Sequence, residues 1–208
     1  TIGRSEKMSK SKKNVIDPED IISTYGADTA RWFMLSDSPP ERDLDWTESG
    51  ITGAWRFSNR LWRLVAANAD SLPPVGTTPE AADIRRPVHA AIAGVTENLE
   101  AFHFNRSVAR VHELVNALSD ADASKDGAVL REGLETVTLL IGPMMPHLAE
   151  ELWRMLGHEE LVAKSSWPVA DERLLVQDTV KLAVQVRGKM RGTAEIPPDA
   201  GQATAEQA

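Results

Sequence analysis

The chain has 208 residues, of which 42% are hydrophobic and 26% charged, which is ordinary for a soluble globular protein. It contains no cysteine, which excludes disulfides, thiolate catalysis and zinc sites built on cysteine. The net charge of −8 argues against a protein devoted to wrapping nucleic acid, and no stretch approaches the roughly 20 apolar residues of a membrane-spanning helix. Basic residues nevertheless cluster near both ends, at 4–13 and 181–191.

The first predicted elements are a basic loop and two short helices. Residues 1–13 mix serine with lysine and lack a helical apolar period. Asp17 is a favourable N-cap, Pro18 suits the first helical position, and Gly26 ends this helix. A second helix is predicted over 27–35, before a pair of prolines that cannot continue it.

Helical periodicity dominates the middle of the chain. From Thr47, residues recur at spacings of three and four, which predicts one buried stripe made of Ile51, Trp55, Ser58, Leu61, Trp62 and Val65. After a proline-rich loop, further helices are predicted over 81–102, 105–118, 125–145 and 146–156. Long helices joined by short loops favour an antiparallel helix bundle.

The period changes to two in the last segment. Apolar and polar residues alternate over 180–186, which predicts a strand, and Gly188 allows a turn into a returning strand over 190–196. A lone hairpin is marginal in water, so these strands are expected to begin a further domain. The predicted fold class is mainly α: a loop-helix segment (1–46), an antiparallel helix bundle (47–168), and the start of a small α+β domain (169–208).

The pentapeptide Lys7-Met8-Ser9-Lys10-Ser11 carries the most specific chemistry. Two lysines three apart on a serine-rich loop can place two ammonium groups around one polyphosphate, with hydroxyl and backbone N–H groups as further donors. Such a loop would stabilise charge on the β- and γ-phosphates as the bond to the α-phosphorus breaks. A basic tail without function would have the same composition, so the pentapeptide alone leaves both interpretations open.

The surrounding sequence resembles the class I aminoacyl-tRNA synthetases. The run from Glu6 to Asn14, followed by 15–22 and 25–31, is similar to the ATP loop of that family and the helix after it. Resemblance to the leucine-specific branch is carried by residues 39–41, 43–46, 53–57, 59–64, 143–153, 166–168 and 184–192. The likeness covers essentially the whole chain.

The resemblance implies a C-terminal portion of a ligase that attaches leucine to tRNA(Leu), using ATP and Mg²⁺. Lys7 and Lys10 would be catalytic, and the ATP-binding loop would comprise Lys7, Met8, Ser9, Lys10 and Ser11. The nucleotide-binding and editing domains of the family would precede Thr1. The chain alone is therefore expected to be inactive and to hold neither ATP nor Mg²⁺. The parent enzyme is expected to be cytoplasmic, monomeric and free of any membrane.

Five further basic residues are candidates for contact with tRNA. Arg56, Arg60 and Arg63 recur at spacings of four and three and so share one face of a helix. That face is either solvated or a ridge that contacts phosphates, and the resemblance favours the ridge. Lys189 and Arg191 in the hairpin are candidates of the same kind, with protection of a strand edge as an equal alternative.

The histidines and tryptophans indicate structural roles. The five histidines are scattered without ligand spacing, so no metal site is predicted. Trp32, Trp55, Trp62 and Trp153 are expected in the core, because they lie among helical apolar positions. Trp46 and Trp167 are expected to pin loops onto the bundle.

Two alternative functions remain open from the sequence. One is a related class I synthetase specific for valine, isoleucine or methionine, because the amino-acid pocket is not in this chain. The other is a stand-alone RNA-binding or protein-interaction bundle without a catalytic parent.

Overall fold

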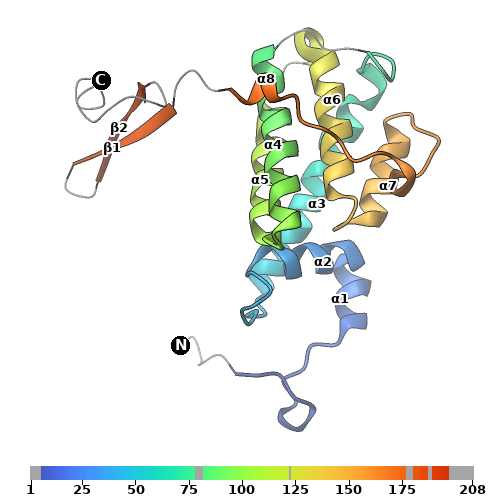
Figure 1. The fold of residues 1–208 in the computed structure, drawn as a ribbon. Helices are drawn as coiled ribbons and strands as arrows, with labels where there is room; N and C mark the ends of the chain where they lie inside the picture. Colours follow the sequence, from blue (N-terminus) through green and yellow to red (C-terminus); the bar gives the residue numbers. More distant parts are fainter. Residues whose placement is uncertain (1–5, 78–81, 122, 177–179, 187–188, 197–208) are drawn as a thin grey trace. The chain divides into compact units, whose positions relative to one another are not determined.

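The computed structural model describes residues 6–77, 82–121, 123–176, 180–186 and 189–196. It divides into two compact units, residues 1–170 and 171–208, each of which is described by itself (Figure 1). Across these described ranges, no helix combines the length and the apolar character needed to cross a bilayer.

Two short helices follow the basic loop, as predicted. They are α1 (Pro18–Tyr25) and α2 (Ala27–Ser36). The Asp17 carboxylate caps α1 by accepting a hydrogen bond of 2.9 Å from the backbone N–H of Glu19. Gly26 separates the helices at a φ of 86°, a left-handed value that glycine adopts readily.

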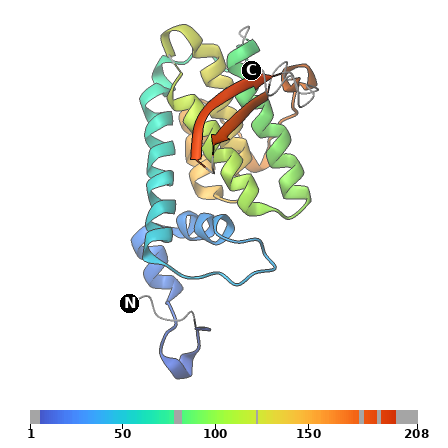
Figure 2. The same cartoon turned by 90° about the vertical axis from the view of Figure 1, so that its left-hand side faces the viewer.

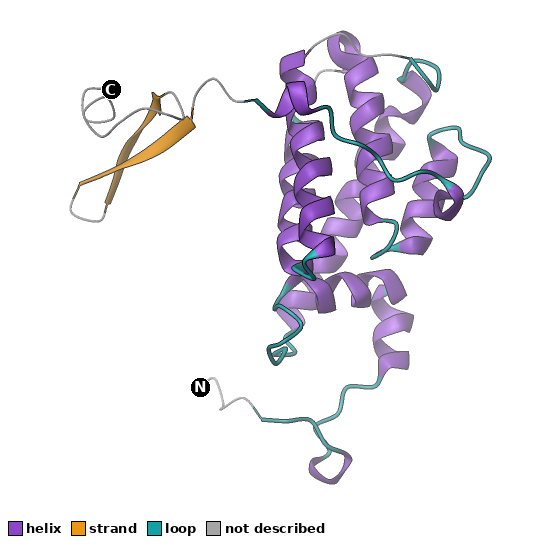
Figure 3. Cartoon of the chain, viewed as in Figure 1, coloured by secondary structure: helices purple, strands orange, loops and turns teal. Residues whose placement is uncertain are grey.

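Five longer helices form the bundle, coloured purple in Figure 3. They are α3 (Glu48–Asn68), α4 (Ala82–Glu100), α5 (Phe104–Ser119), α6 (Ala123–Ile141) and α7 (Pro146–Met155). Short 3₁₀ turns occur at η1 (Lys10–Lys12), η2 (Ala69–Ser71) and η3 (Val162–Lys164). Helices α4, α5 and α6 pack against one another, and α2 contacts α3, α5 and α7. The predicted mainly helical bundle is confirmed.

Helix α6 ends four residues earlier than the predicted 145. Gly142 and Pro143 interrupt it, because proline has no N–H with which to continue the helical hydrogen bonds. The backbone N–H groups of Met144 and Met145 instead turn back onto the carbonyl of Ile141, at 2.9 and 2.7 Å. The chain is thereby redirected into α7.

The core lies among the facing sides of all these helices. Its fully buried side chains include Leu61, Val65, Val95, Val111, Leu114, Leu134, Val137, Leu140, Ile141 and Leu152. Burying one such side chain stabilises the folded state by roughly 1.5–3 kcal/mol. Helix α6 supplies the largest share of this list, so it is the central helix of the unit.

The expectation for the four helical tryptophans is half wrong. Trp32 and Trp153 are buried, as predicted, with 1% and 7% of their surface exposed. Trp55 and Trp62 are 42% and 41% exposed, so they do not belong to the core. The buried stripe of α3 consists instead of Ile51, Ala54, Phe57, Leu61 and Val65. Because each residue turns the helix by about 100°, this stripe leaves both exposed tryptophans on its flank.

The two loop tryptophans do pin connections onto the bundle. The ring of Trp46 meets that of Phe33 edge-on, with centroids 5.1 Å apart. The indole N–H of Trp167 donates a hydrogen bond of 2.8 Å to the Thr96 hydroxyl on α4. Gly50 allows the close approach at Phe33, since a Cβ there would lie 2.4 Å from a ring carbon. Both expectations are confirmed.

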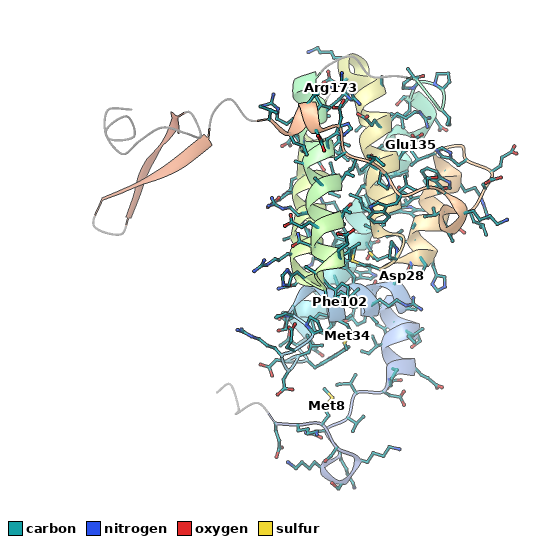
Figure 4. The ribbon with its side chains drawn as sticks, viewed as in Figure 1. Met8, Asp28, Met34, Phe102, Glu135 and Arg173 are labelled. Carbon is teal, nitrogen blue, oxygen red and sulfur yellow. The ribbon has the colours of Figure 1, made fainter. Side chains whose placement is uncertain are left out.

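A carboxylate of α2 caps α7 across the fold. The first turn of α7 has no capping side chain of its own, because its N-cap residue is Met145. The backbone N–H of Leu148 donates instead to Oδ2 of Asp28, at 2.7 Å. The other oxygen of Asp28 accepts from Arg31 at 2.7 Å and lies 3.4 Å from the His147 ring. Figure 4 shows Asp28 where α2 meets α7.

A second buried polar cluster holds the other end of α7. Arg131 on α6 is only 6% exposed, and its guanidinium donates to the Leu156 carbonyl at 2.9 Å and to the carbonyl of Pro73. Glu135, labelled in Figure 4, neutralises Arg131 at 2.9 Å and contacts His158 at 3.0 Å. The buried charge is thus paired with a carboxylate and donates hydrogen bonds from Nε and Nη1, which helps an interior to tolerate it.

The second unit contains a short helix and a hairpin. Helix α8 (Glu172–Leu175), which the periodicity did not predict, is capped by Asp171. Strand β1 (Val180–Val186) pairs antiparallel with β2 (Lys189–Ile196), as predicted. The predicted turn at Gly188 lies outside the described residues.

His112 lies in an aromatic cluster between α2, α3 and α5. Its ring centroid is 4.2 Å from that of Phe57 and 6.0 Å from that of Trp32. Burial lowers the pKa of His112, and the nearby positive charge of Arg60 lowers it further. The neutral imidazole is therefore the form that the packed bundle accepts.

Replacing Asp28 with alanine is expected to destabilise the protein by about 1–2 kcal/mol, because it removes the cap of α7 and a partly buried partner of Arg31. Chemical denaturation measures the difference. Asp37→Ala is the matched control, since Asp37 is exposed and, among the described residues, its carboxylate accepts a hydrogen bond only from its neighbour Ser38. Equal stabilities of the Asp28 and Asp37 variants would contradict the capping role.

The lowered pKa of His112 makes stability depend on pH. The unfolded chain takes up the proton at a higher pH than the folded chain, so folding stability falls as pH drops below about 6.5. His112→Leu is expected to show a shallower fall in unfolding free energy between about pH 7.5 and pH 5. Arg60→Met is expected to show a fall in unfolding free energy between those of the His112→Leu variant and the original protein. It removes the charge of Arg60, one of the two causes of the lowered pKa, and leaves the burial of His112. Identical slopes in all three proteins would refute this assignment.

Candidate functional site

The basic loop has a defined turn. Ser9 is extended, the single 3₁₀ turn η1 follows, and Lys13 closes it in the left-handed region at a φ of 54°. The backbone N–H of Lys13 donates to the carbonyl of Lys10 at 3.2 Å, and that of Lys12 to the carbonyl of Ser9 at 3.1 Å. The hydroxyls of Ser9 and Ser11 are 3.2 Å apart. The pentapeptide is thus a folded turn and not an extended tail.

Asn14 closes this turn, and the sequence reasoning did not identify it. Its Oδ1 accepts a hydrogen bond of 2.8 Å from the backbone N–H of Ser9, and its Nδ2 donates to the carbonyl of Lys7 at 3.4 Å. One side chain therefore holds the backbone on both sides of Met8. The signal in the sequence was an asparagine directly after the lysine- and serine-rich run, because asparagine side chains bond readily to nearby backbone.

The loop lysines differ in their partners. Lys12 forms an ion pair with Glu6, and both side chains are exposed. Lys7 and Lys10 are exposed, and within the described residues their ammonium groups have no ion-pair partner. Met8, labelled in Figure 4, is 42% exposed. The ammonium groups of Lys7 and Lys10, on one short turn, can bind the oxygens of a polyphosphate.

The three arginines of α3 also differ in their partners. Arg56, Arg60 and Arg63 line one hollow of about 260 Å³, so they share a face as expected. The guanidinium of Arg60 donates to Asn116 at 2.7 Å and to Ser119 at 3.0 Å, which ties α3 to α5. Arg56 and Arg63 are exposed and, in the part of the chain that the structure describes, pair with no acidic side chain. These two guanidinium groups are available to an anion.

The candidates in the hairpin are known only by their backbone positions. Lys189 begins β2 opposite Val186. The register shifts between Val184, which faces Gly192, and Gln185, which faces Met190, so Arg191 is the extra residue of a β-bulge. Bulges redirect side chains from the regular alternation of a strand. The side chains of Lys189 and Arg191 lie outside the described residues.

The histidines occupy separate places in the bundle. His89 approaches Glu132 at 3.3 Å, while His158 stacks on Trp153 with ring centroids 3.6 Å apart. Among the residues with a described placement, no group of three or more acidic or histidine side chains could hold a metal ion.

Two family models match this chain. Residues 2–47 match the model described as tRNA synthetases class I (I, L, M and V). Residues 82–206 match the model described as the anticodon-binding domain of tRNA ligase. The turn with Lys7 and Lys10 lies in the first range, and α3 lies between the two.

Curated relatives and a solved structure agree with these models. A leucine–tRNA ligase of Paramagnetospirillum magneticum is 62% identical over 214 residues, which cover 100% of this chain and 25% of the relative. The corresponding ligase of Parvibaculum lavamentivorans is 54% identical over 215 residues, with the same coverage.

The solved structure is an LeuRS of Agrobacterium radiobacter in a ternary complex with tRNA and LeuAMS. It is 31% identical, has a TM-score of 0.77, and the match covers 97% of this chain and 27% of that one. The chain therefore spans about a quarter of the length of its relatives. The chain belongs to the family described as the anticodon-binding domain of tRNA ligase, and the two relatives described above are leucine–tRNA ligases.

Proposed function

We propose that this chain supplies the ATP-phosphate loop and the tRNA-binding helices of a leucine–tRNA ligase. The observation that carries the proposal is the turn at 7–14, in which Lys7 and Lys10 have no ion-pair partner among the described residues and the backbone is held by Asn14. The match of residues 2–47 to class I synthetases supports it. In this proposal, residues 1–46 carry the ATP-phosphate loop and the helical connector, residues 47–168 bind tRNA, and residues 169–208 begin an α+β domain.

The reaction of the whole ligase has two steps. The carboxylate of leucine attacks the α-phosphorus of ATP, which releases pyrophosphate and leaves leucyl-AMP. A ribose hydroxyl of the terminal adenosine of tRNA(Leu) then attacks the leucyl carbonyl, and AMP leaves. Mg²⁺ would supply further neutralisation of phosphate charge when bound. Lys10 is the first candidate, and Lys7 the second, for neutralising the departing pyrophosphate. Ser9 and Ser11 would add hydroxyl donors, and Met8 would complete the loop.

Contact with tRNA is assigned to the basic side chains away from the loop. Arg56 and Arg63 are the principal candidates on α3, while Arg60 adds charge to the same hollow from its place against α5. Lys189 and Arg191 remain candidates for the hairpin. Such contacts would position RNA through its phosphates without reading bases. A monomeric, cytoplasmic enzyme is part of this proposal, and the absence of cysteine is compatible with a reducing compartment.

In a full-length ligase that contains these residues, Lys10→Ala is expected to slow leucine-dependent ATP–pyrophosphate exchange by about 100-fold or more, because a donor to the developing charge is lost. Lys7→Ala should also slow the exchange. Lys12→Ala is the matched control and should leave exchange within about threefold, because the charge of Lys12 is already paired with Glu6. Full activity after loss of both Lys7 and Lys10 would end the assignment of the loop.

The 208-residue chain by itself is expected to give no ATP–pyrophosphate exchange. Lysines that neutralise a leaving group need the rest of a nucleotide and amino-acid site to place the reactants in line. The assay is run on the purified chain beside a full-length ligase. Exchange above the buffer background would contradict this expectation.

Asn14→Ala is expected to lower the same exchange rate in the full-length enzyme by about tenfold, the equivalent of roughly one lost hydrogen bond. Asn14→Asp retains the acceptor for the N–H of Ser9 but lacks the donor to Lys7, so it should be intermediate. Equal rates for the asparagine, aspartate and alanine forms would show that the clamp has no role.

A further inference from the structure

One face of α3 combines positive charge with exposed aromatic rings. Residues 49–69 contain three arginines and no acidic residue, in a chain whose net charge is −8. Trp55 and Trp62 project from the same helix with 42% and 41% of their surface exposed. They are seven residues apart, which is two helical turns, or about 10.5 Å along the axis. Figure 2 shows α3 along one edge of the bundle.

Two hollows lie on either side of a ridge formed by Trp55 and Asn59. The first, of about 260 Å³, is lined by these two residues and by Arg56, Arg60 and Arg63. The second, of about 210 Å³, adds Trp62 and Tyr25, together with Thr29, Ser58 and Leu148. The amide of Asn59 is fixed by a hydrogen bond of 2.8 Å to the carbonyl of Trp55. A basic hollow and an aromatic hollow are therefore contiguous.

The size and chemistry of the pair favour a segment of a polyanion over a free small molecule. Each hollow is smaller than the roughly 300–1,000 Å³ of an ordinary ligand pocket. Arg56 and Arg63 have no acidic partner within the described residues, so their charge is uncompensated. Guanidinium groups bind phosphate, and indole rings offer faces on which nucleobases stack. A phosphate-binding hollow beside a base-stacking hollow matches the phosphate and base of one nucleotide.

We infer that this surface of α3 binds an unpaired nucleotide of the RNA partner. Arg56 and Arg63 contact its phosphates in the basic hollow, and the base stacks against Trp55 or Trp62 in the aromatic hollow. The inference rests on the proposed function for the existence of an RNA partner, and it adds the mode of contact and two residues. It concerns a helix that lies outside both ranges matched by the family models.

Binding of the 208-residue chain to a tRNA(Leu) transcript tests the inference. The double variant Trp55→Ala/Trp62→Ala is expected to weaken binding by roughly 5- to 150-fold without changing its salt dependence, because stacking is worth about 1–3 kcal/mol per base. The two single variants then identify the ring on which the base stacks. Trp55→Phe and Trp62→Phe should restore most of the affinity. Arg56→Gln and Arg63→Gln should each reduce the slope of log affinity against log salt by about one.

Two comparisons make the test specific. Trp167→Phe is the matched control, because Trp167 is also exposed but its indole N–H donates to Thr96. The affinity of this variant for the transcript should match that of the original chain. A short RNA duplex without unpaired nucleotides should bind the original chain and the Trp55 and Trp62 variants equally. Circular dichroism and thermal melting establish that each variant is folded.

The outcomes separate the inference from the function on which it rests. If the original chain does not bind the transcript at all, the proposed tRNA contact and the inference both fail. If the chain binds but loss of both tryptophans leaves affinity unchanged, only the inference fails. The tryptophan variants could instead keep their RNA affinity but lose self-association, or lose binding to a separately expressed remainder of a ligase. Either result would assign the surface to protein contact and overturn the inference.

Discussion

The hydrogen bond between the Asp28 carboxylate and the backbone of α7 is the interaction on which the arrangement of the first unit depends. Asp28 lies on α2, and it caps the first turn of α7 by accepting from Leu148, 120 residues later in the chain. Because α2 follows α1 after one glycine, and α1 follows the loop with Lys7 and Lys10, this bond anchors the loop-helix segment to the bundle. A helix N-terminus attracts negative charge, so the capping bond also supplies the partner that a partly buried carboxylate requires.

Pairing of charges decides which cations can serve a ligand. Lys12 is compensated by Glu6, Arg60 is held by α5, and Arg131 is neutralised inside the bundle. Among the cations without an ion-pair partner in the described residues are Lys7 and Lys10 on the loop turn and Arg56 and Arg63 on the exposed side of α3. An acidic chain can therefore present local sites for phosphate, because the total charge does not determine the potential beside a few unpaired groups.

Helix α3 connects the two candidate sites. It contacts α2 at the end nearer the loop and runs along the edge of the bundle, where it also packs against α7 (Figure 2). RNA bound along this helix would be oriented relative to the segment that carries the lysine turn. Positioning of this kind contributes to a reaction by holding reactants in geometry, without any chemical group of the helix touching the reacting atoms.

The sequence by itself determined the helix bundle and the hairpin, because apolar period, capping residues and proline positions act locally, and it placed Lys7 and Lys10 on a loop. It also assigned the family through motifs in the right order. Only the tertiary structure decided that Trp55 and Trp62 are exposed, since periodicity leaves the centre of a buried stripe uncertain by one position. Only the tertiary structure also showed that Asp28 caps α7, that Asn14 bonds to the loop backbone and that Arg60 bonds to α5. Each depends on a partner that local sequence does not specify, because chain folding alone brings the two groups together.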